Sequence, residues 1–549
     1  MYERFKSFIK GKNFSQAELK SLLPADISID ILKYKRTFWE EIESLKESVE
    51  NFPDEYKEDD NTEKSVLDVL LESGIFPTYS FPKDVVGFHI ENFKGDKVDQ
   101  KPDRALEMAI SEYAPGRLVV VNKTTYKSGG VYSFHSKFRA GEQETPARPF
   151  FDSKDYFKTL YYCSDSSCNW MGLDYFASCP FCGKQTIVEQ KMLKPWGFAP
   201  INGRPTKEAE AEADLSYAEA PSYSITPKED EMIASSDYAN VRYAKRSDDP
   251  LIILNMGPKK KGFMVCQDCG AAVPGDDEAE FTNQRVNQPY RHPLHPNTIC
   301  RHPSTRIVNT YLGHQFRTDL LVFEMALDPY KVNTETAGLW IKRAGQSVAE
   351  AMVLAAGRIL DIEFNEIKSG YRIRYDYNKR LVYVDVFLFD SLSSGAGYCA
   401  TLSEQTSKLL KETEKVLEYC PKKCDSACHD CLQHFWNQRV HTQLDRFAGL
   451  ELLKWCKNSA LAAPLTYRQQ DELLKPLGRL SPRYQISRDG TNHYVECNGQ
   501  KTRIYVYPAM WNKYSKSIPQ DAIAVSDKSI KYALPQVDAV IREAVEKEN

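Results

Sequence analysis

The sequence lacks the features that direct a protein into or across a membrane. No stretch of its 549 residues approaches the roughly 20 consecutive apolar residues that a membrane helix requires. The N-terminus, Met1-Tyr-Glu-Arg-Phe-Lys, has no positively charged region followed by an apolar core, so no signal peptide is expected. We therefore expect a cytoplasmic protein without membrane contacts.

An excess of positive charge is also absent. The 72 lysine and arginine residues are balanced by 76 aspartate and glutamate residues, which leaves a formal net charge of −4. A chain of this kind does not coat nucleic acid through its bulk charge. Any contact with nucleic acid must therefore come from a local patch.

Motifs for nucleotide hydrolysis and nucleic-acid cleavage are missing as well. The sequence contains no Gly-x4-Gly-Lys-Ser/Thr loop, so nothing in it is expected to cradle a triphosphate. The acidic run from Asp277 to Glu280 resembles a helicase Walker B box, but no apolar strand precedes it. His135 and Lys137 resemble half of a phospholipase-D-type nuclease motif, yet Glu142 occupies the position that requires Asp. We expect that the protein is not an enzyme.

The composition is that of a folded protein with several domains. Hydrophobic residues make up 42% of the chain and charged residues 27%. At roughly 100–200 residues per domain, the length corresponds to about three to five domains. Strand-like and helix-like stretches are mixed, which favours the α+β class.

Periodicity and turn residues predict individual elements. A β-hairpin is expected where Leu118-Val-Val-Val121 and Val131-Tyr-Ser-Phe134 flank a turn at Ser128-Gly-Gly130. Further strands are expected at 251–254, 371–375, 382–388 and 504–507. Helices are expected at 346–362, 400–418 and 444–455, with a last helix near Val537.

Fourteen cysteines are the most informative feature, because eleven of them fall into three groups. In a chain without a secretion signal, clustered cysteines favour metal binding over disulfides. The first group, Cys163-x4-Cys168-x10-Cys179-x2-Cys182, has two short-spaced pairs that can surround one ion with four thiolates. It predicts a structural zinc ribbon.

The second group combines cysteines with a histidine. Its candidate ligands are Cys266, Cys269, His292, His295 and Cys300. Either of the first two histidines is sterically possible, so the choice between them is open. His302 is not preferred as a ligand, because it lies very close to Cys300 in the sequence.

The third group is Cys420-x3-Cys424-x3-Cys428-x2-Cys431, four thiols within twelve residues. Such a loop can wrap one zinc ion, and an iron–sulfur cluster is the alternative. No group leaves an obvious position for water, so structural zinc is expected rather than catalytic zinc. The cofactor prediction is two or three structural Zn²⁺ ions.

The region around the third group resembles a known family. Asp390-Ser-Leu-Ser-Ser-Gly-Ala-Gly-Tyr precedes the four cysteines, and Cys428-His-Asp-Cys-Leu-Gln-His-Phe-Trp-Asn extends onward to Arg446. This order is similar to the zinc-binding module at the C-terminus of MrfA-type superfamily 2 DNA helicases. It is also similar to DrmB, the partner of the helicase in the DISARM antiphage system. The likeness extends from about Leu67 to Trp455, and both motor domains are missing.

The resemblance implies that the third group binds zinc, and it defines a family signature. The signature residues are Asp390, Gly395, Gly397, Asn437, His441, Asp445 and Arg446. The two glycines permit a tight turn that either binds a phosphate or packs closely against the zinc loop. Asp445-Arg446, at a helix start, form either an N-cap with an ion pair or a DNA contact.

Local basic residues are the candidates for nucleic-acid binding. They are Lys259, Lys260, Lys261 and Arg439. Lysines near aromatic side chains can follow the phosphates of a single strand while the rings stack on bases. Runs of lysine are more often simply solvated, and that alternative stays open.

These observations predict a multidomain α+β chain with zinc-ribbon-like modules and a C-terminal α/β domain that carries a four-cysteine zinc site. The predicted segments are an N-terminal helical segment at 1–65, a β-rich domain at 66–150, a zinc ribbon at 151–204, an acidic linker or insertion at 205–240, a second zinc-binding β domain at 241–330, a helicase-associated four-cysteine zinc-binding domain at 331–460 and a C-terminal α/β extension at 461–549.

The expected function is that of a non-catalytic zinc-binding accessory subunit. It would partner a superfamily 2 DNA helicase, contribute to DNA binding and act in bacterial antiphage defence. One alternative is the C-terminal half of a split MrfA-like DNA repair helicase. The other is a nuclease that uses Asp390, His441 and Asp445 as a polar cluster.

Overall fold

The computed structural model describes most of the chain after residue 84. The described residues are 85–547 except 92–97, 133–156, 166–167, 169, 207–221, 224–228, 276–298, 336–338, 363–365, 377–378, 392–396, 481–483 and 498–499. The N-terminal helical segment, most of the acidic segment, His292, His295 and Gly395 lie outside them. In the described part, no helix combines the length and the apolar character needed to cross a bilayer.

A five-stranded sheet with the order β4-β1-β10-β6-β5 comes first. Its strands are β1 (Val85–Phe88), β4 (Asp103–Ala105), β5 (Leu118–Val121), β6 (Thr124–Val131) and β10 (Gly197–Pro200). Strands β2 (Ile90–Glu91) and β3 (Val98–Gln100) pair separately. Helix α5 (Leu106–Glu112) contributes Ile110 to a core that also holds Phe88 and Phe198, all fully buried.

Strands β5 and β6 form a hairpin in the predicted region, but its turn and its second strand differ from the prediction. The chain reverses at Asn122 and Lys123, whose φ angles are 48° and 64°. Positive φ at both central residues is typical of a type I′ turn. The predicted turn glycines lie inside β6, where a Cβ on Gly129 would come within 2.6 Å of Ile201. The prediction of a turn at 128–130 is therefore wrong, because these glycines permit close packing instead.

A second, eleven-stranded sheet has the central order β11-β13-β16-β9-β7-β8. Its longest strands, β13 (Val241–Asn255) and β16 (Ile307–Leu327), run antiparallel along their length. The others are β7 (Phe157–Cys163), β8 (Met171–Gly172), β9 (Ile187–Leu193), β11 (Ser222–Tyr223), β12 (Ile233–Ala234), β14 (Phe263–Cys266), β15 (Ala272–Pro274), β17 (Ile367–Asp376) and β18 (Leu381–Asp390). The predicted strands at 251–254, 371–375 and 382–388 are confirmed. Strand β16 pairs with β14 and also with β18. The sheet is therefore continuous across residue 330, where the sequence predicted a boundary between two domains.

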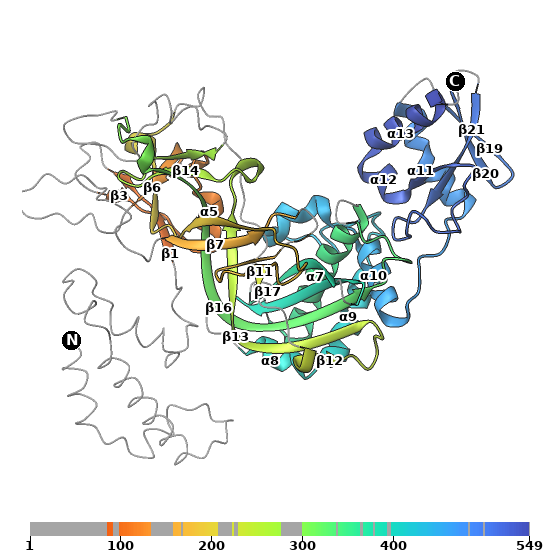
Figure 1. Cartoon of the computed structure of the whole chain (residues 1–549), viewed down its shortest axis with the longest axis horizontal. Coiled ribbons are helices and arrows are strands. Elements are labelled where there is room, and N and C mark those ends of the chain that lie inside the picture. Colours follow the sequence, from red (N-terminus) through yellow and green to blue (C-terminus); the bar gives the residue numbers. More distant parts are fainter. Residues whose placement is uncertain are drawn as a thin grey trace, which may run out of the picture. The chain divides into compact units, whose positions relative to one another are not determined.

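Helices cover one face of this sheet around β16 and β18 (Figure 1). They are α7 (Leu339–Leu360), α8 (Tyr398–Ser403), α9 (Thr406–Glu418) and α10 (Arg446–Asn458). Phe323 and Val386 from the strands share a buried core with Met352 of α7. The predicted helix at 400–418 is two helices, because the chain leaves helical geometry at Gln405 (φ −122°, ψ 27°).

The opposite face of the same strands carries buried charges. Glu324 of β16 lies opposite Arg242 of β13 on one side and opposite Asp385 of β18 on the other. Asp385 in turn lies opposite Arg372 of β17. The nitrogen–oxygen distance is 2.6 Å from Arg242 to Glu324 and 2.9 Å from Arg372 to Asp385. Arg374 contacts both carboxylates. Each buried charge therefore has an opposite charge beside it, which offsets the desolvation penalty.

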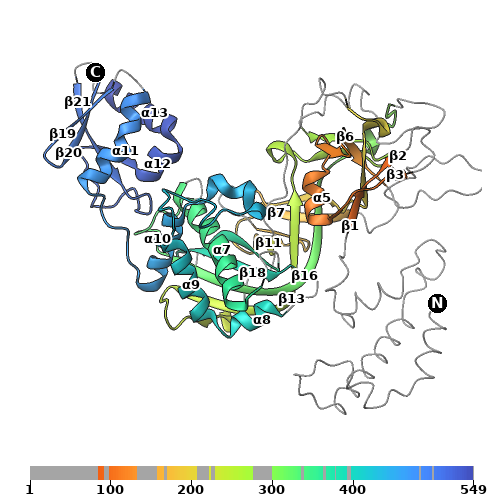
Figure 2. The same ribbon diagram turned by 180° about the vertical axis from the view of Figure 1, so that it is seen from behind.

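The C-terminal region has its own sheet and core. Its strands, in the order β19-β20-β21-β22, are β19 (Tyr484–Asp489), β20 (Asn492–Cys497), β21 (Gln500–Tyr507) and β22 (Ile523–Ser526). The helices are α11 (Tyr467–Leu480), α12 (Asp527–Tyr532) and α13 (Leu534–Lys547), seen from behind in Figure 2. Leu474, Val495, Val506 and Ile541 form the core. The predicted strand at 504–507 and the helix near Val537 are confirmed.

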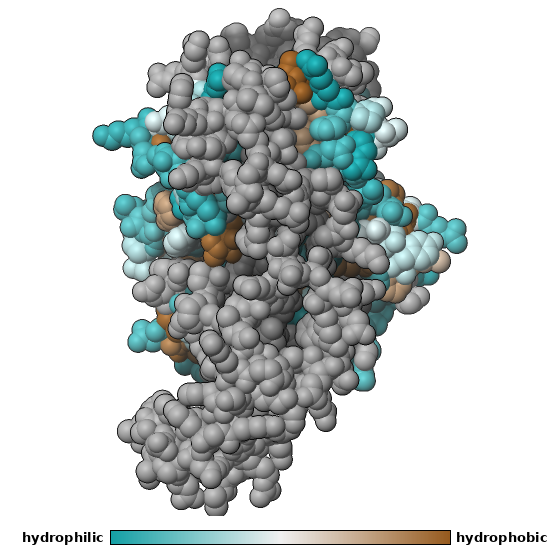
Figure 3. Space-filling model, turned by 90° about the vertical axis from the view of Figure 1, so that its left-hand side faces the viewer, coloured by the Kyte–Doolittle hydropathy of each residue, from teal (hydrophilic) through white to brown (hydrophobic). Residues whose placement is uncertain are grey.

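The surface is mainly polar on the side drawn in Figure 3. There the described residues are mostly hydrophilic, and the hydrophobic ones are scattered among them. In the described part of the chain, the large hydrophobic side chains exposed by more than half are Val120, Tyr175, Ile233, Tyr330, Tyr419, Phe435, Trp436 and Tyr514.

Replacing Asp385 tests the buried charge ladder. Asp385→Ala leaves Arg372 and Arg374 buried without their shared carboxylate, so the free energy of unfolding of this sheet should fall by about 3–5 kcal/mol. Native-state hydrogen exchange of the β17 and β18 amides measures the change. Glu472→Ala, which breaks an exposed pair with Lys475, is the control and should have an effect of about 0.5 kcal/mol or less. Equal exchange rates in the two variants would contradict the prediction.

Candidate metal centres

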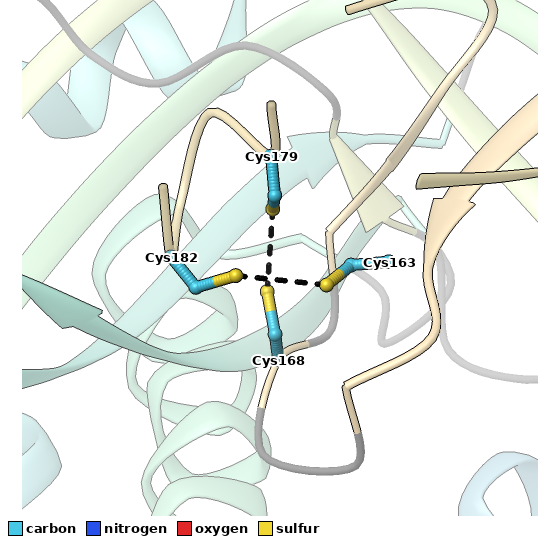
Figure 4. A group of neighbouring side chains, drawn as sticks. All are labelled: Cys163, Cys168, Cys179 and Cys182. Atoms are coloured by element: carbon cyan, nitrogen blue, oxygen red, sulfur yellow. Dashed lines mark hydrogen bonds between the residues drawn. The ribbon is translucent and has the colours of Figure 1, made fainter. Parts of the chain in front are cut away.

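The first cysteine group forms a compact tetrad. Cys163 ends β7, Cys168 follows in the next loop, and Cys179 and Cys182 lie in a turn before β9. Figure 4 shows the four sulfur atoms pointing toward one centre. The Sγ–Sγ distance is 3.6 Å both from Cys163 to Cys182 and from Cys168 to Cys179.

This geometry fits a tetrahedral zinc ion. A Zn–S bond of about 2.3 Å gives tetrahedron edges of about 3.8 Å, whereas a disulfide requires about 2.05 Å. Burial raises the pKa of the Cys179 thiol to about 11, so a positive charge is needed to hold it as a thiolate at neutral pH. Zinc supplies that charge. Gly183, with a φ of 67°, closes the turn by donating its N–H to the Cys179 carbonyl.

The second group brings together Cys266, Cys269, Cys300 and His302. His302 Nδ1 lies 3.4 Å from Cys266 Sγ and 3.5 Å from Cys300 Sγ. The described residues thus offer His302 as the fourth ligand, a histidine that the sequence analysis did not prefer. Residues two apart in an extended chain point to the same side, so closeness in sequence allows both side chains to face one ion. The choice between His292 and His295 stays a prediction.

The knuckle of this second group is anchored on both sides. Asp268, between the first two cysteines, pairs with Arg306, with an Nη2–Oδ1 distance of 2.5 Å. Gly270 has a φ of 72°, and a Cβ there would come within 2.3 Å of the Val131 carbonyl oxygen. Glycine is therefore required for the close approach of the knuckle to β6.

The third group wraps its four sulfurs within one loop after α9. The Sγ–Sγ distance is 3.6 Å both from Cys420 to Cys428 and from Cys424 to Cys431. The backbone N–H of Cys424 lowers the pKa of the Cys420 thiol to about 6. The N–H of Cys428 donates to Cys431 Sγ at 3.2 Å. Amide donors of this kind favour thiolates, the form that binds zinc.

Asp390 and Gly397 of the family signature shape the start of α8. Asp390 is fully buried, and its carboxylate accepts the N–H groups of Tyr398 and Cys399 at 3.2 and 3.0 Å. Gly397 has a φ of 80°, and a Cβ there would meet no atom within 4 Å, so conformation rather than space requires glycine. The amides that follow this turn are therefore engaged by Asp390.

Asn437 and His441 stabilise the short helix η9 (Phe435–Gln443) after the zinc loop. Asn437 Oδ1 accepts the N–H of His434 at 2.9 Å and lies 2.8 Å from His441 Nε2. Asn437 Nδ2 donates to the Leu432 carbonyl at 2.8 Å. Both signature side chains therefore have structural partners.

Asp445 and Arg446 connect α10 with the zinc loop. Asp445 is the N-cap of α10 and accepts the N–H groups of Phe447 and Ala448. This confirms the expected N-cap. Arg446 donates to the carbonyls of Glu418 at 2.9 Å and Cys424 at 3.2 Å. The ion pair of Asp445 is formed with Lys528, at 2.9 Å.

The predicted nucleic-acid residues lie in two separate elements. Lys259, Lys260 and Lys261 are exposed in the turn between β13 and β14, and the first two have φ angles of 50° and 60°. The backbone of Arg439 belongs to η9. DNA contact by these residues stays a prediction.

Exposed aromatic side chains near the third group were missed by the sequence analysis. Tyr419, Phe435 and Trp436 are 71%, 72% and 55% exposed, and the rings of the last two form an edge contact at 5.2 Å. Large aromatic residues are expected to be buried, so the sequence did not indicate that these three are exposed. Only the folded structure shows it.

Metal analysis tests the zinc centres. Elemental analysis should find three zinc ions per chain, and Cys168→Ser, Cys269→Ser and Cys424→Ser should each remove about one. His302→Ala should weaken zinc binding at the second group by at least tenfold in chelator competition. His292→Ala and His295→Ala are the matched controls. Unchanged binding in His302→Ala, with a loss in either control, would assign the ligand to that other histidine.

Comparisons with known proteins identify part of the chain. Residues 348–432, which include all four cysteines of the third group, match the family MrfA Zn-binding domain. Over 528 residues the chain is 30% identical to Druantia protein DruE of Escherichia coli strain UMEA 4076-1, a match that covers 89% of this chain and 28% of DruE.

Two crystal structures of the DUF1998 helicase MrfA are also similar to the chain. The match to the structure bound to DNA covers 70% of this chain and 35% of that chain, at 9% identity and a TM-score of 0.32. The match to the structure bound to DNA and AMPPNP covers 67% and 32%, at 8% identity and a TM-score of 0.24. The family match confirms the expected resemblance: this chain contains an MrfA-type zinc-binding module.

Proposed function

We propose that this chain is a non-catalytic, zinc-binding accessory component that works with a superfamily 2 DNA helicase motor and contributes to DNA binding in bacterial antiphage defence. The observation that carries the proposal is the match of residues 348–432 to the MrfA Zn-binding domain. The likeness to DruE, a protein of the antiphage system Druantia, favours defence.

The zinc module, which we define as residues 339–458 with α7–α10 and the third cysteine group, offers a surface suited to a single DNA strand. Phe435 and Trp436 present exposed rings, on which bases can stack. Lys422, 71% exposed in the zinc loop, is a cation that can contact phosphates. The zinc ligands, of which Cys420 is buried and the other three are half-buried, and the capped α10 hold this surface rigid, which suits a guide for DNA.

In a second arrangement, the motor and this region belong to one longer polypeptide. The length of DruE supports it, because the chain spans 28% of DruE. The split MrfA-like repair helicase is the related alternative. Deleting the gene separates these functions, because a defence role lowers survival of phage infection and a repair role lowers survival of DNA damage.

Single-stranded DNA binding tests the aromatic surface. The double variant Phe435→Ala/Trp436→Ala should bind a single-stranded oligonucleotide at least tenfold more weakly, because each stacked base contributes about 1–3 kcal/mol. Fluorescence anisotropy measures the Kd. Tyr330→Ala/Tyr514→Ala removes two equally exposed tyrosines outside the zinc module and is the matched control. Equal affinities in the two variants would contradict this surface.

Co-expression tests the partnership. Co-expressed with a superfamily 2 helicase from the same genome, the chain should co-elute with it in size-exclusion chromatography, with or without DNA. The chain alone should hydrolyse no ATP and cleave no DNA. Separate elution under both conditions, or ATP hydrolysis by the chain alone, would overturn the proposal.

A further inference from the structure

Helix α12 of the C-terminal region contacts a buried carboxylate of the zinc module. Lys528 and Tyr532, both on α12, converge on Asp445 Oδ2. The Lys528 Nζ distance is 2.9 Å and the Tyr532 hydroxyl donates at 2.8 Å. Asp445 is fully buried and the Lys528 side chain is 6% exposed. Burial alone would raise the pKa of Asp445, but Lys528, Lys531 and Tyr532 together outweigh burial and the pKa is lowered.

Helix α7 completes the receiving site for α12. The guanidinium of Arg343 lies 3.5 Å from the centroid of the Tyr532 ring. Arg343 also donates to the Thr442 carbonyl at 2.6 Å, which fixes the guanidinium beside η9. The site therefore holds both ends of the Tyr532 side chain, its ring and its hydroxyl.

The metal loop contributes a third contact. Lys531 of α12 donates its Nζ to the carbonyl of Asp425, which lies between the zinc ligands Cys424 and Cys428. The next carbonyl, that of Ser426, accepts the N–H of Arg446 at 2.9 Å. Two consecutive carbonyls of the loop thus bind α12 and α10. Their direction depends on how the four thiolates fold the loop around one ion.

We propose that α12 is a zinc-dependent latch: metal at the third group presents Asp425 and Asp445 to α12, and loss of that metal releases α12 from the zinc module. The segment at Met510 stays packed in the core of the large sheet. The C-terminal sheet also stays folded, because the core residues of β19–β22 and α11–α13 form a separate cluster. The latch is independent of the proposed helicase partnership.

Hydrogen exchange of the full-length chain tests the latch. With zinc bound, the amides of α12 and of β20–β21 should both be protected. Chelation should accelerate exchange in α12 at least tenfold while β20–β21 stays protected, and added zinc should restore α12. An exchange rate in α12 that does not change when zinc is removed, or a simultaneous loss of protection in β20–β21, would overturn the proposal.

Substitution of the carboxylate separates the latch from metal binding. Asp445→Asn keeps an oxygen to cap α10 but removes the charge that holds Lys528, so α12 should exchange at least tenfold faster while three zinc ions remain bound. Lys528→Met tests the same pair from the other side if Asp445→Asn folds poorly. Two control variants should leave α12 unchanged: Lys475→Met, at an exposed position of α11, and Cys168→Ser, which disrupts the first zinc group. Protection of α12 equal to that of the native chain in both Asp445→Asn and Lys528→Met would refute the latch.

Discussion

Zinc–thiolate binding is the constraint on which this structure depends, because a metal that binds the folded loops adds its binding free energy to the free energy of folding. Each zinc knuckle also fixes one neighbouring element. Phe181, between two ligands of the first group, lies 4.3 Å from the guanidinium of Arg372 in β17. Gly270 of the second group accepts the N–H of Val131 at 2.9 Å. Asp425 of the third group accepts Lys531 of α12. The metal loops therefore also join segments that are distant in the sequence.

Buried polar groups supply the second level of specificity. The ladder centred on Glu324 and Asp385 joins four strands of the large sheet, and Asp390 and Asp445 each cap a helix in the zinc module. A misplaced strand or helix would leave one of these charges buried without a partner, which is strongly unfavourable. The signature residues that the structure describes are thus understood as structural elements, in accord with the proposed role of holding DNA and a motor in place.

Much of the fold was predictable because its signals are local. Alternation in 382–388 marks a strand, which the fold buries on both faces, and apolar spacing in 346–362 marks the helix that covers it. The predictions that were wrong concern places where packing in the folded protein overrides the local conformational preference of the sequence. Ser128-Gly-Gly130 carries the residues of a turn, yet close packing against Ile201 draws its glycines into a strand. The chain bends at Gln405, although the sequence there continues a helical pattern.

By itself, the sequence determined which thiols share an ion, because short spacings in each cysteine group leave few ways to surround a metal. It also determined the family of the module, since the ordered motifs around the third group match the MrfA Zn-binding domain. The tertiary structure alone decided that His302 faces the second group, that Phe435 and Trp436 stay exposed, and that Asp445 receives Lys528. Such contacts join residues from distant parts of the chain or depend on the direction of the backbone, and neither is encoded in local spacing.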